Sequence, residues 1–319
     1  MATFTDDLLD RPVVQGACAV ALAYLDDATA AAVRLGDGSD REALHAFRVA
    51  IRRLRVTVRA YPGIHESVPK NQRRRLRKLA RATNAVRDAD VQIEWFNERS
   101  ARFTPAQRAA LAPFRARLRA RRRSELAHAQ QKLQRWFGTL ERKLRRRLAA
   151  LQVDAGPHEA PFRAVAAVTL VRYAGELEAR LAEVTQSTDA AQLHATRIAA
   201  KRVRYLLEPL EPGLPDGVDS PLMERLKQLQ DLFGALTDAH ELEVTFQREG
   251  AAVAAAAGVL RDDVTAVFDE FRSRSSPQGF GLERDVEAAA QRLRPTAKAA
   301  RPPRSLQQPA RPHRRSAPA

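Results

Sequence analysis

The sequence predicts an all-α protein made of two four-helix-bundle-like repeats with pseudo-two-fold symmetry, followed by a disordered basic C-terminal tail. Three observations support this prediction. Ala, Leu and Arg dominate the 319 residues while strand-forming runs are scarce, which favours helices. Apolar residues recur at helical spacing between short breaker segments. Two blocks of sequence also recur after about 150 residues, which indicates a duplicated unit.

The helices of the first unit are predicted between segments that break helices. These breakers are GDGSD at 36–40, YPG at 61–63 and Pro105. A capping box of sequence S-D-R-E, from Ser39 to Glu42, is expected to begin the second helix. The predicted helices span residues 12–35, 40–60, 69–86, 88–100 and 105–150, with a break in the last one near Gly138.

The second unit is predicted to repeat this pattern from about Pro157, with breaks at EPGLPDG from Glu211 and SSPQG from Ser275. Amphipathic helices joined by short loops favour antiparallel bundles. The tail is rich in Pro, Ala and Arg and cannot build a core, so we expect it to be disordered. The resulting division is 1–153 for the first repeat, 154–294 for the second and 295–319 for the tail.

The cysteine content and the N-terminal residues favour a cytoplasmic location. Acidic residues stand where a signal peptide needs cations. No run reaches about 18 uninterrupted apolar residues, so neither a transmembrane helix nor a membrane partner is expected. Cys18 is the single cysteine, which excludes an intrachain disulfide and fits a reducing compartment.

Positive charge is concentrated in one part of the chain. Residues 41–147 hold 30 cations and 8 acids, whereas residues 148–294 hold 16 cations and 23 acids. The first stretch therefore carries a net charge of +22 within a total of +16. A focused field of this size attracts a polyanion by long-range steering.

Each copy of the first repeated block is a histidine followed by a ladder of cations. The copies read LHAFRVAIRRLR and LHATRIAAKRVR, 149 positions apart. On a helical wheel the cations form one stripe beside an apolar stripe. Like charges at i,i+4 destabilise a helix by about 0.2–0.5 kcal/mol per pair, so we expect an anion to neutralise both ladders. The stripes contain His45, Arg48, Arg52, Arg55 and Arg59 in the first copy and His194, Arg197, Lys201 and Arg204 in the second, where Glu208 replaces Arg59.

A second repeated block follows each ladder. LRKLARATNAVRDADVQIEWF aligns with LKQLQDLFGALTDAHELEVTF. Arg77 matches Lys227 in this alignment, and Arg81 lies one turn after Arg77. We interpret the equivalent residues Asp88 and Asp238 as partners that orient neighbouring cations, rather than as catalytic acids.

These motifs resemble the CHAD family, the conserved histidine α-helical domain. The resemblance rests on H-x-x-R-x-x-x-[RK]-[RK]-x-R at His45 and His194 and on the L-[RK]-x-L…RDAD stretch, and it covers roughly residues 10–294. It implies two four-helix bundles with a cationic groove or pore between them, binding of inorganic polyphosphate, and association with cytoplasmic polyphosphate granules. Arg53 and Arg202 enter from the motif alone, because the wheel places them off the main stripe. The implied polyphosphate-binding residues are His45, Arg48, Arg52, Arg53, Arg55, Arg77 and Arg81 in the first unit and His194, Arg197, Lys201, Arg202, Arg204 and Lys227 in the second.

Three other functions compete with this interpretation. A di-metal enzyme could use Glu42 and His45, but the second copy has Ala191 where Glu42 stands. We therefore predict no catalytic residues, no metal and no cofactor.

Nucleic-acid binding is permitted by the charge, although aromatic residues make up only 6% of the chain and none interleaves with the ladders. It is therefore expected to be weak or non-specific. Recruitment of other granule-associated proteins is compatible with polyphosphate binding.

Overall fold

The computed structural model describes residues 2–36, 40–154, 159–214, 221–274 and 281–293. The regular secondary structure of these segments is entirely helical. They contain no strand, and an isolated β-bridge pairs Pro12 with Pro161. This confirms the predicted all-α class. The predicted tail, 295–319, and the SSPQG break lie outside the described residues, and the duplication stays a prediction.

The first half of the chain runs from α1 to α7. Its elements are α1 (Asp7–Asp10), α2 (Val13–Arg34), α3 (Arg41–Ala60), α4 (Pro62–Ser67), α5 (Lys70–Ala82), α6 (Asn84–Glu98), η1 (Ser100–Arg102) and α7 (Pro105–Asp154). The second half contains α8 (Phe162–Ala182), α9 (Ala190–Leu207), η2 (Glu208–Gly213), α10 (Pro221–Glu249), η4 (Gly250–Val253), α11 (Ala254–Arg274) and α12 (Leu282–Arg292). The two histidine stretches thus lie on α3 and α9.

Three local predictions differ from the structure. The break expected between residues 86 and 88 falls at Thr83, whose hydroxyl donates to the Ala80 carbonyl at 2.8 Å. The break expected near Gly138 is wrong, because α7 continues through it. The N-cap of α3 is Asp40, whose carboxylate accepts hydrogen bonds from the backbone amides of Glu42 and Ala43. This satisfies two amides that have no partner within the helix. Ser39, the cap expected from sequence, lies outside the described residues.

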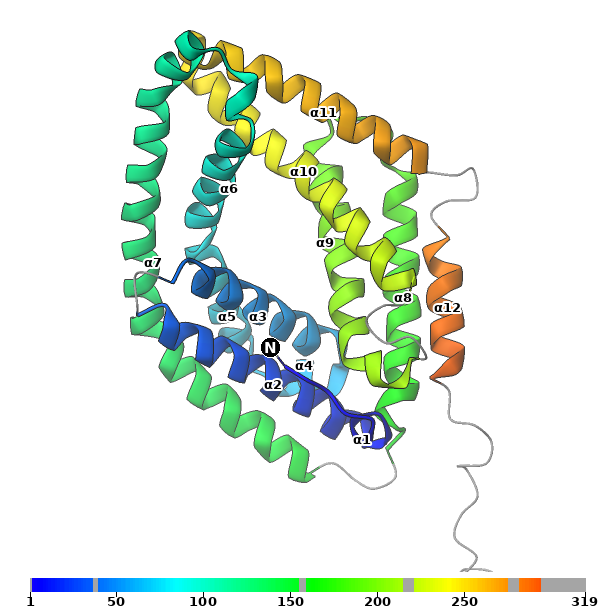
Figure 1. Cartoon of the computed structure of the whole chain (residues 1–319). Coiled ribbons are helices and arrows are strands. Elements are labelled where there is room, and N and C mark those ends of the chain that lie inside the picture. Colours follow the sequence, from blue (N-terminus) through cyan, green and yellow to red (C-terminus); the bar gives the residue numbers. More distant parts are fainter. Residues whose placement is uncertain (1, 37–39, 155–158, 215–220, 275–280, 294–319) are drawn as a thin grey trace, which may run out of the picture.

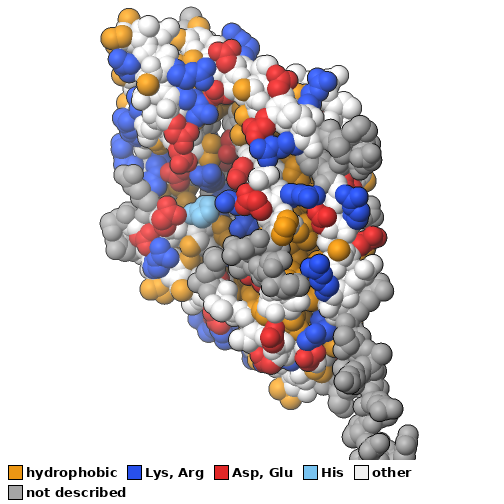
Figure 2. All heavy atoms as spheres, turned by 45° about the vertical axis from the view of Figure 1, so that its right-hand side comes forward, with side chains coloured by type: hydrophobic (Ala, Val, Ile, Leu, Met, Phe, Trp, Pro, Cys, Tyr) orange, Lys and Arg blue, Asp and Glu red, His pale blue; other side chains and the backbone are white. Residues whose placement is uncertain are grey.

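The helices form a base with two arms that meet at the far end (Figure 1). The base contains α2, α3, α8 and α9. One arm consists of α6 and the first part of α7, and the other of α10 and α11; they touch where α6 contacts α10 and α7 contacts η4. Between the arms the molecular surface is hollowed, with charged side chains of both signs around the hollow (Figure 2).

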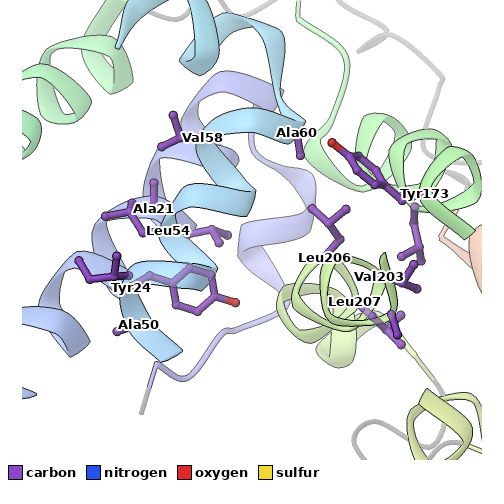
Figure 3. Packing of buried hydrophobic residues seen from close by; sticks show 14 of the residues in the cluster. Ala21, Tyr24, Ala50, Leu54, Val58, Ala60, Tyr173, Val203, Leu206 and Leu207 are labelled. Atoms are coloured by element: carbon purple, nitrogen blue, oxygen red, sulfur yellow. The ribbon is translucent and has the colours of Figure 1, made fainter. Parts of the chain in front are cut away.

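One buried apolar cluster joins the two halves of the base. Figure 3 shows Tyr24 and Leu54, from α2 and α3, on one side, with Val203, Leu206 and Leu207 of α9 on the other. All five side chains are buried. Burial of an apolar side chain of this size stabilises the fold by about 1.5–3 kcal/mol, so the cluster fixes how α3 faces α9.

A second, smaller cluster closes the far end of the arms. Its aromatic members include Trp95 and Phe96 from α6 and Phe246 from α10, whose ring centroids lie 5.0–5.9 Å apart. Ion pairs surround it, among them Arg99 with Asp263. We call this cluster, with its ion pairs, the apex.

By length and composition α2 could cross a membrane. The core helix of a folded protein passes the same test, and α2 packs against α3, α7 and α8.

A buried ion pair links α3 to the turn after α9. Arg53 Nε lies 2.7 Å from Glu208 Oε2, and the two side chains are only 8% and 10% exposed. The Arg53 guanidinium also lies 5.7 Å from the ring centroids of both Tyr24 and Tyr205. Because Glu208 follows α9 directly, the pair sets the register between the two histidine helices.

We expect Glu208→Ala to lower the free energy of unfolding by about 3–5 kcal/mol, because it leaves the buried charge of Arg53 without a partner. Denaturant unfolding measures this change. The double variant Arg53→Met/Glu208→Leu should recover most of the loss, since no buried charge remains. Unchanged stability of Glu208→Ala would contradict the structural role of the pair.

Candidate anion-binding site

The two cationic ladders, on helices far apart in the sequence, meet at one place. Helices α3 and α9 pack together, and Arg52 Nη1 lies 3.5 Å from the Tyr205 hydroxyl across their contact. After burial, the positive charge of Arg52 is one of the causes that lower the pKa values of Arg48 on its own helix and of Arg197 and Lys201 on α9. We call these four residues, with Arg87 of α6, the central cluster.

Arg48 is held in place by the junction between α5 and α6. Its Nη1 donates to Thr83 Oγ1 at 2.6 Å and to Asn84 Oδ1 at 3.1 Å. Burial, followed by the charge of Arg52, lowers the pKa of Arg48 to about 10. Both hydrogen-bond acceptors are neutral, so they fix the position of the guanidinium and leave its charge available.

On α9, Arg197 has a single nearby carboxylate. Its Nη2 lies 3.4 Å from Asp238 Oδ1, in agreement with the predicted orienting role of this acid. Its Nε is buried and has no acceptor among the described residues. A buried donor without a partner is costly; this Nε lies against Gly234 of α10, so it belongs to the packing between α9 and α10.

Lys201 is the most strongly perturbed cation of the site. Burial, then the charges of Arg197 and Arg52, lower its pKa from 10.5 to about 6. Asp238 acts in the opposite direction but does not compensate. The fold therefore holds more positive charge here than its own carboxylates neutralise.

The two histidines lie next to this cluster with exposed side chains. The pKa of His45 is lowered by partial burial and then by the charge of Arg87. The pKa of His194 is lowered by partial burial and then by the charge of Arg197. Both imidazoles are therefore neutral near pH 7 in the free protein, with ring nitrogens that can donate or accept one hydrogen bond each.

A second group of cations continues from the central cluster along α3. Arg55 lies within electrostatic reach of Arg77 and Arg81 on α5 and of Arg202 on α9. Burial is the first cause that lowers the pKa of Arg55 and of Arg202. Arg202 is in turn affected by Arg59 and Arg180. We call this set the peripheral cluster, and it extends the positive path beyond Arg52.

The structure places three of the predicted contact residues elsewhere. Arg53 is buried against Glu208. Arg204 approaches the same carboxylate, with Nε 3.3 Å from Glu208 Oε1, and Gln230 at 3.3 Å. Lys227 is exposed on α10, with no ion pair among the described residues. These side chains stabilise the fold or face solvent, and they do not join either cluster.

Three cations of the two clusters are not among the residues that were predicted from the sequence to bind polyphosphate. Arg87 belongs to the central cluster, and its position in the RDAD motif was a usable signal. Arg59 lies on the predicted first ladder but is not among the implied polyphosphate-binding residues. Arg180 lies on α8, outside both repeated blocks, and only the packing of α8 against α9 brings it near Arg202.

A small pocket opens beside the central cluster. It has a volume of about 180 Å³ and lies between α6, α10 and α11, with Arg87 and Asp238 in its wall beside apolar residues such as Leu242. Among the described residues no group of three or more His, Cys, Asp or Glu side chains could hold a metal ion.

The fold and the site define a class of protein: an all-helical protein in which two histidine-bearing helices combine their cations in one partly buried cluster. The family model described as the CHAD domain matches residues 19–247, and the chain belongs to the CHAD family. The structure is similar to the crystal structure of the CHAD domain from the plant Ricinus communis, with a TM-score of 0.65 and 21% identity over 91% of this chain and 95% of that one. At this identity the likeness concerns the fold. No curated protein sequence matches the chain.

We expect Lys201→Met to raise the melting temperature of the ligand-free protein by about 2–4 °C, because it removes a charge that the folded state repels. Folded Lys201 releases its proton near pH 6 and the unfolded lysine near 10.5, so its penalty shrinks as pH rises between these values. The gain should therefore be larger at pH 6 than at pH 9. Thermal unfolding at both pH values checks this.

Lys227→Met is the matched control, since Lys227 is exposed and belongs to neither cluster. It should leave the melting temperature unchanged. If both variants shift the melting temperature equally, or if Lys201→Met lowers it, the charge of Lys201 does not destabilise the folded protein.

Proposed function

We propose that the protein binds inorganic polyphosphate at the central cluster, without catalysing a reaction. The observation that supports this most directly is the excess positive charge gathered by Arg48, Arg52 and Arg197, beside Lys201, which gains its proton when an anion binds or when the pH falls to about 6. An anion would neutralise the cluster. Arginine is well suited to this, because its guanidinium binds phosphate oxygens through two parallel hydrogen bonds.

A chain of phosphates fits the site better than an isolated phosphate ion. The central cluster contains five cations from α3, α6 and α9, and the peripheral cluster prolongs it along α3. A linear polyanion can contact both clusters at once, and linked contacts increase affinity by their effective concentration. Membership of the CHAD family agrees with this ligand.

Nucleic acid is a poorer ligand for this particular site. The central cluster is partly buried between packed helices, whereas a duplex presents its phosphates on a wide, rigid cylinder. Single strands are held through bases stacked on aromatic rings. The ring nearest to Arg52 is Tyr205, which is buried beneath the cations.

The ligand determines the proposed location and partners. A protein that binds long polyphosphate chains would be retained on cytoplasmic polyphosphate granules, where other granule-associated proteins would be its neighbours. The mode of action is an electrostatic clamp, in which arginine and lysine side chains replace the counterions of the polymer.

The variant Arg48→Ala/Arg52→Ala/Arg197→Ala/Lys201→Ala should lose at least 100-fold in affinity for long-chain polyphosphate, because four contacts disappear and charged hydrogen bonds contribute about 1.5–3 kcal/mol each. Calorimetry at moderate salt measures this, with circular dichroism to verify helicity. Excess duplex DNA should not displace the polymer from the wild type.

A control for net charge is Arg172→Ala/Arg248→Ala/Arg261→Ala/Arg272→Ala, which removes four exposed arginines from the second half of the chain. It should bind polyphosphate within about threefold of the wild type, since the screened charges lie outside the site. If both variants lose affinity equally, the protein binds polyanions through its overall charge and has no dedicated site.

Affinity for polyphosphate should rise as pH falls from 8 to 5. Lys201, with a pKa of about 6 in the free protein, gains a proton when an anion binds, and one linked proton changes affinity by up to about tenfold per pH unit. Lys201→Arg should remove the dependence above pH 6. His45→Asn/His194→Asn should reduce the rise at acidic pH, because burial and neighbouring cations lower the pKa values of both imidazoles. A flat profile would refute this linkage.

A further inference from the structure

The second part of α7 carries a row of cations that neither cluster uses. The helix buries Leu133, Leu140 and Leu144 against the main core. At 100° per residue, the opposite side of the helix carries five basic residues, all exposed. We call them the outer row: Lys132, Arg135, Arg142, Lys143 and Arg146.

The outer row lacks compensating acids. Between residues 126 and 153 the sequence contains one acidic residue, Glu141. Its carboxylate accepts a hydrogen bond from Arg145 Nε at 2.6 Å and lies on the flank of the helix. Arg142 and Arg146 are spaced at i,i+4, where like charges repel. No ion pair to a row residue is found among the described residues, so the row keeps its full charge.

The backbone positions of the row fall into two groups, and the Arg142 guanidinium leans back over Gly138, with Nη1 3.7 Å from where a Cβ at that glycine would lie. Gly138 and Thr139, two small residues, are exposed between Arg135 and Arg142. The seven residues from Arg135 to Arg142 correspond to about 10.5 Å along the helix axis. This is close to the roughly 12 Å width of the major groove of B-DNA.

The outer row also differs from the central cluster in accessibility. It lies on the convex outside of the molecule, because the buried face of α7 packs on α2 and α5. A rigid duplex can approach such a surface, although it is too wide to reach the side chains between α3 and α9. The aromatic rings on this part of α7, Trp136 and Phe137, are partly buried and buried, respectively, against the main core, which favours contacts to a phosphate backbone over stacking with single-stranded bases.

We propose that the outer row of α7 binds the phosphate backbone of a nucleic-acid duplex, as a second polyanion site independent of the central cluster. Backbone contacts carry no base information, so binding is independent of sequence and strongly dependent on salt. The proposal holds whatever ligand occupies the central cluster. If polyphosphate is that ligand, the protein can hold both polyanions at once.

The test uses the full chain and a labelled 20-base-pair DNA duplex of mixed sequence, with fluorescence anisotropy measured between 50 and 200 mM salt. The row variant is Lys132→Ala/Arg135→Ala/Arg142→Ala/Arg146→Ala. The exposed-arginine variant of the second half is the matched control, because it changes net charge equally and keeps the same tail. We expect the row variant to lose at least tenfold in affinity for the duplex. The slope of log affinity against log salt concentration should become shallower by about 3–4, because each lost phosphate contact contributes about 0.9. The control should stay within about threefold.

Independence is tested by repeating the titration with saturating polyphosphate and with Arg52→Ala/Lys201→Ala. Duplex binding should persist in both. Equal DNA affinity of the row variant and the control would overturn the proposal, and so would loss of DNA binding in the central-cluster variant. Binding to vesicles of anionic phospholipid is measured in parallel. If the row variant loses vesicle binding but retains its affinity for DNA, the proposal is also overturned. Polyphosphate binding is measured separately, so failure of the one site is distinguishable from failure of the other.

Discussion

Repulsion between like charges held at close range is the constraint on which this structure depends. Arg48, Arg52, Arg197 and Lys201 would separate if α3 and α9 were free to move. The pKa values of Arg48 and Lys201 are lowered first by burial and then by the charges of their cationic neighbours. Apolar packing of Tyr24 and Leu54 against Leu206 opposes it. The ion pair of Arg53 with Glu208 adds a directional contact beneath the cluster. The core thus stabilises an arrangement that electrostatics alone would disperse, as is usual where a protein is organised to receive a ligand.

The helices and their faces could be predicted from the sequence because periodicity reports the buried side of one helix at a time. The meeting of the two ladders could not, since it depends on how α3 packs against α9. The neighbouring residues Arg52 and Arg53 illustrate the difference. The family motif includes both, yet Arg52 lies in the central cluster whereas Arg53 pairs with a buried carboxylate. Arg180 was unpredictable for the same reason, because tertiary packing alone brings it to Arg202. Local misses had local causes, such as the buried hydroxyl of Thr83 that ends α5.

The predicted alignment of the two units assigns different tasks to equivalent positions. Glu208 stands where the first ladder has Arg59, and Arg202 stands where the first unit has Arg53. In the structure Glu208 neutralises Arg53, whereas Arg59 lies near Arg202 in the peripheral cluster. One carboxylate in place of one cation therefore divides four related positions into a buried structural pair and an open cationic pair. Pseudo-symmetry of sequence does not require symmetry of charge.

The apex has a kinetic consequence. It is the contact at which the two arms meet (Figure 1), and its apolar cluster is separate from the main core. A polymer seated between the arms would be encircled. It could leave by sliding along its own length or by waiting for the apex to separate. Its residence time would then increase with contour length and with the lifetime of the closed ring, even where the equilibrium affinity of each phosphate is modest. Loops and bulky end groups on the polymer would be trapped or excluded on topological grounds, independently of charge.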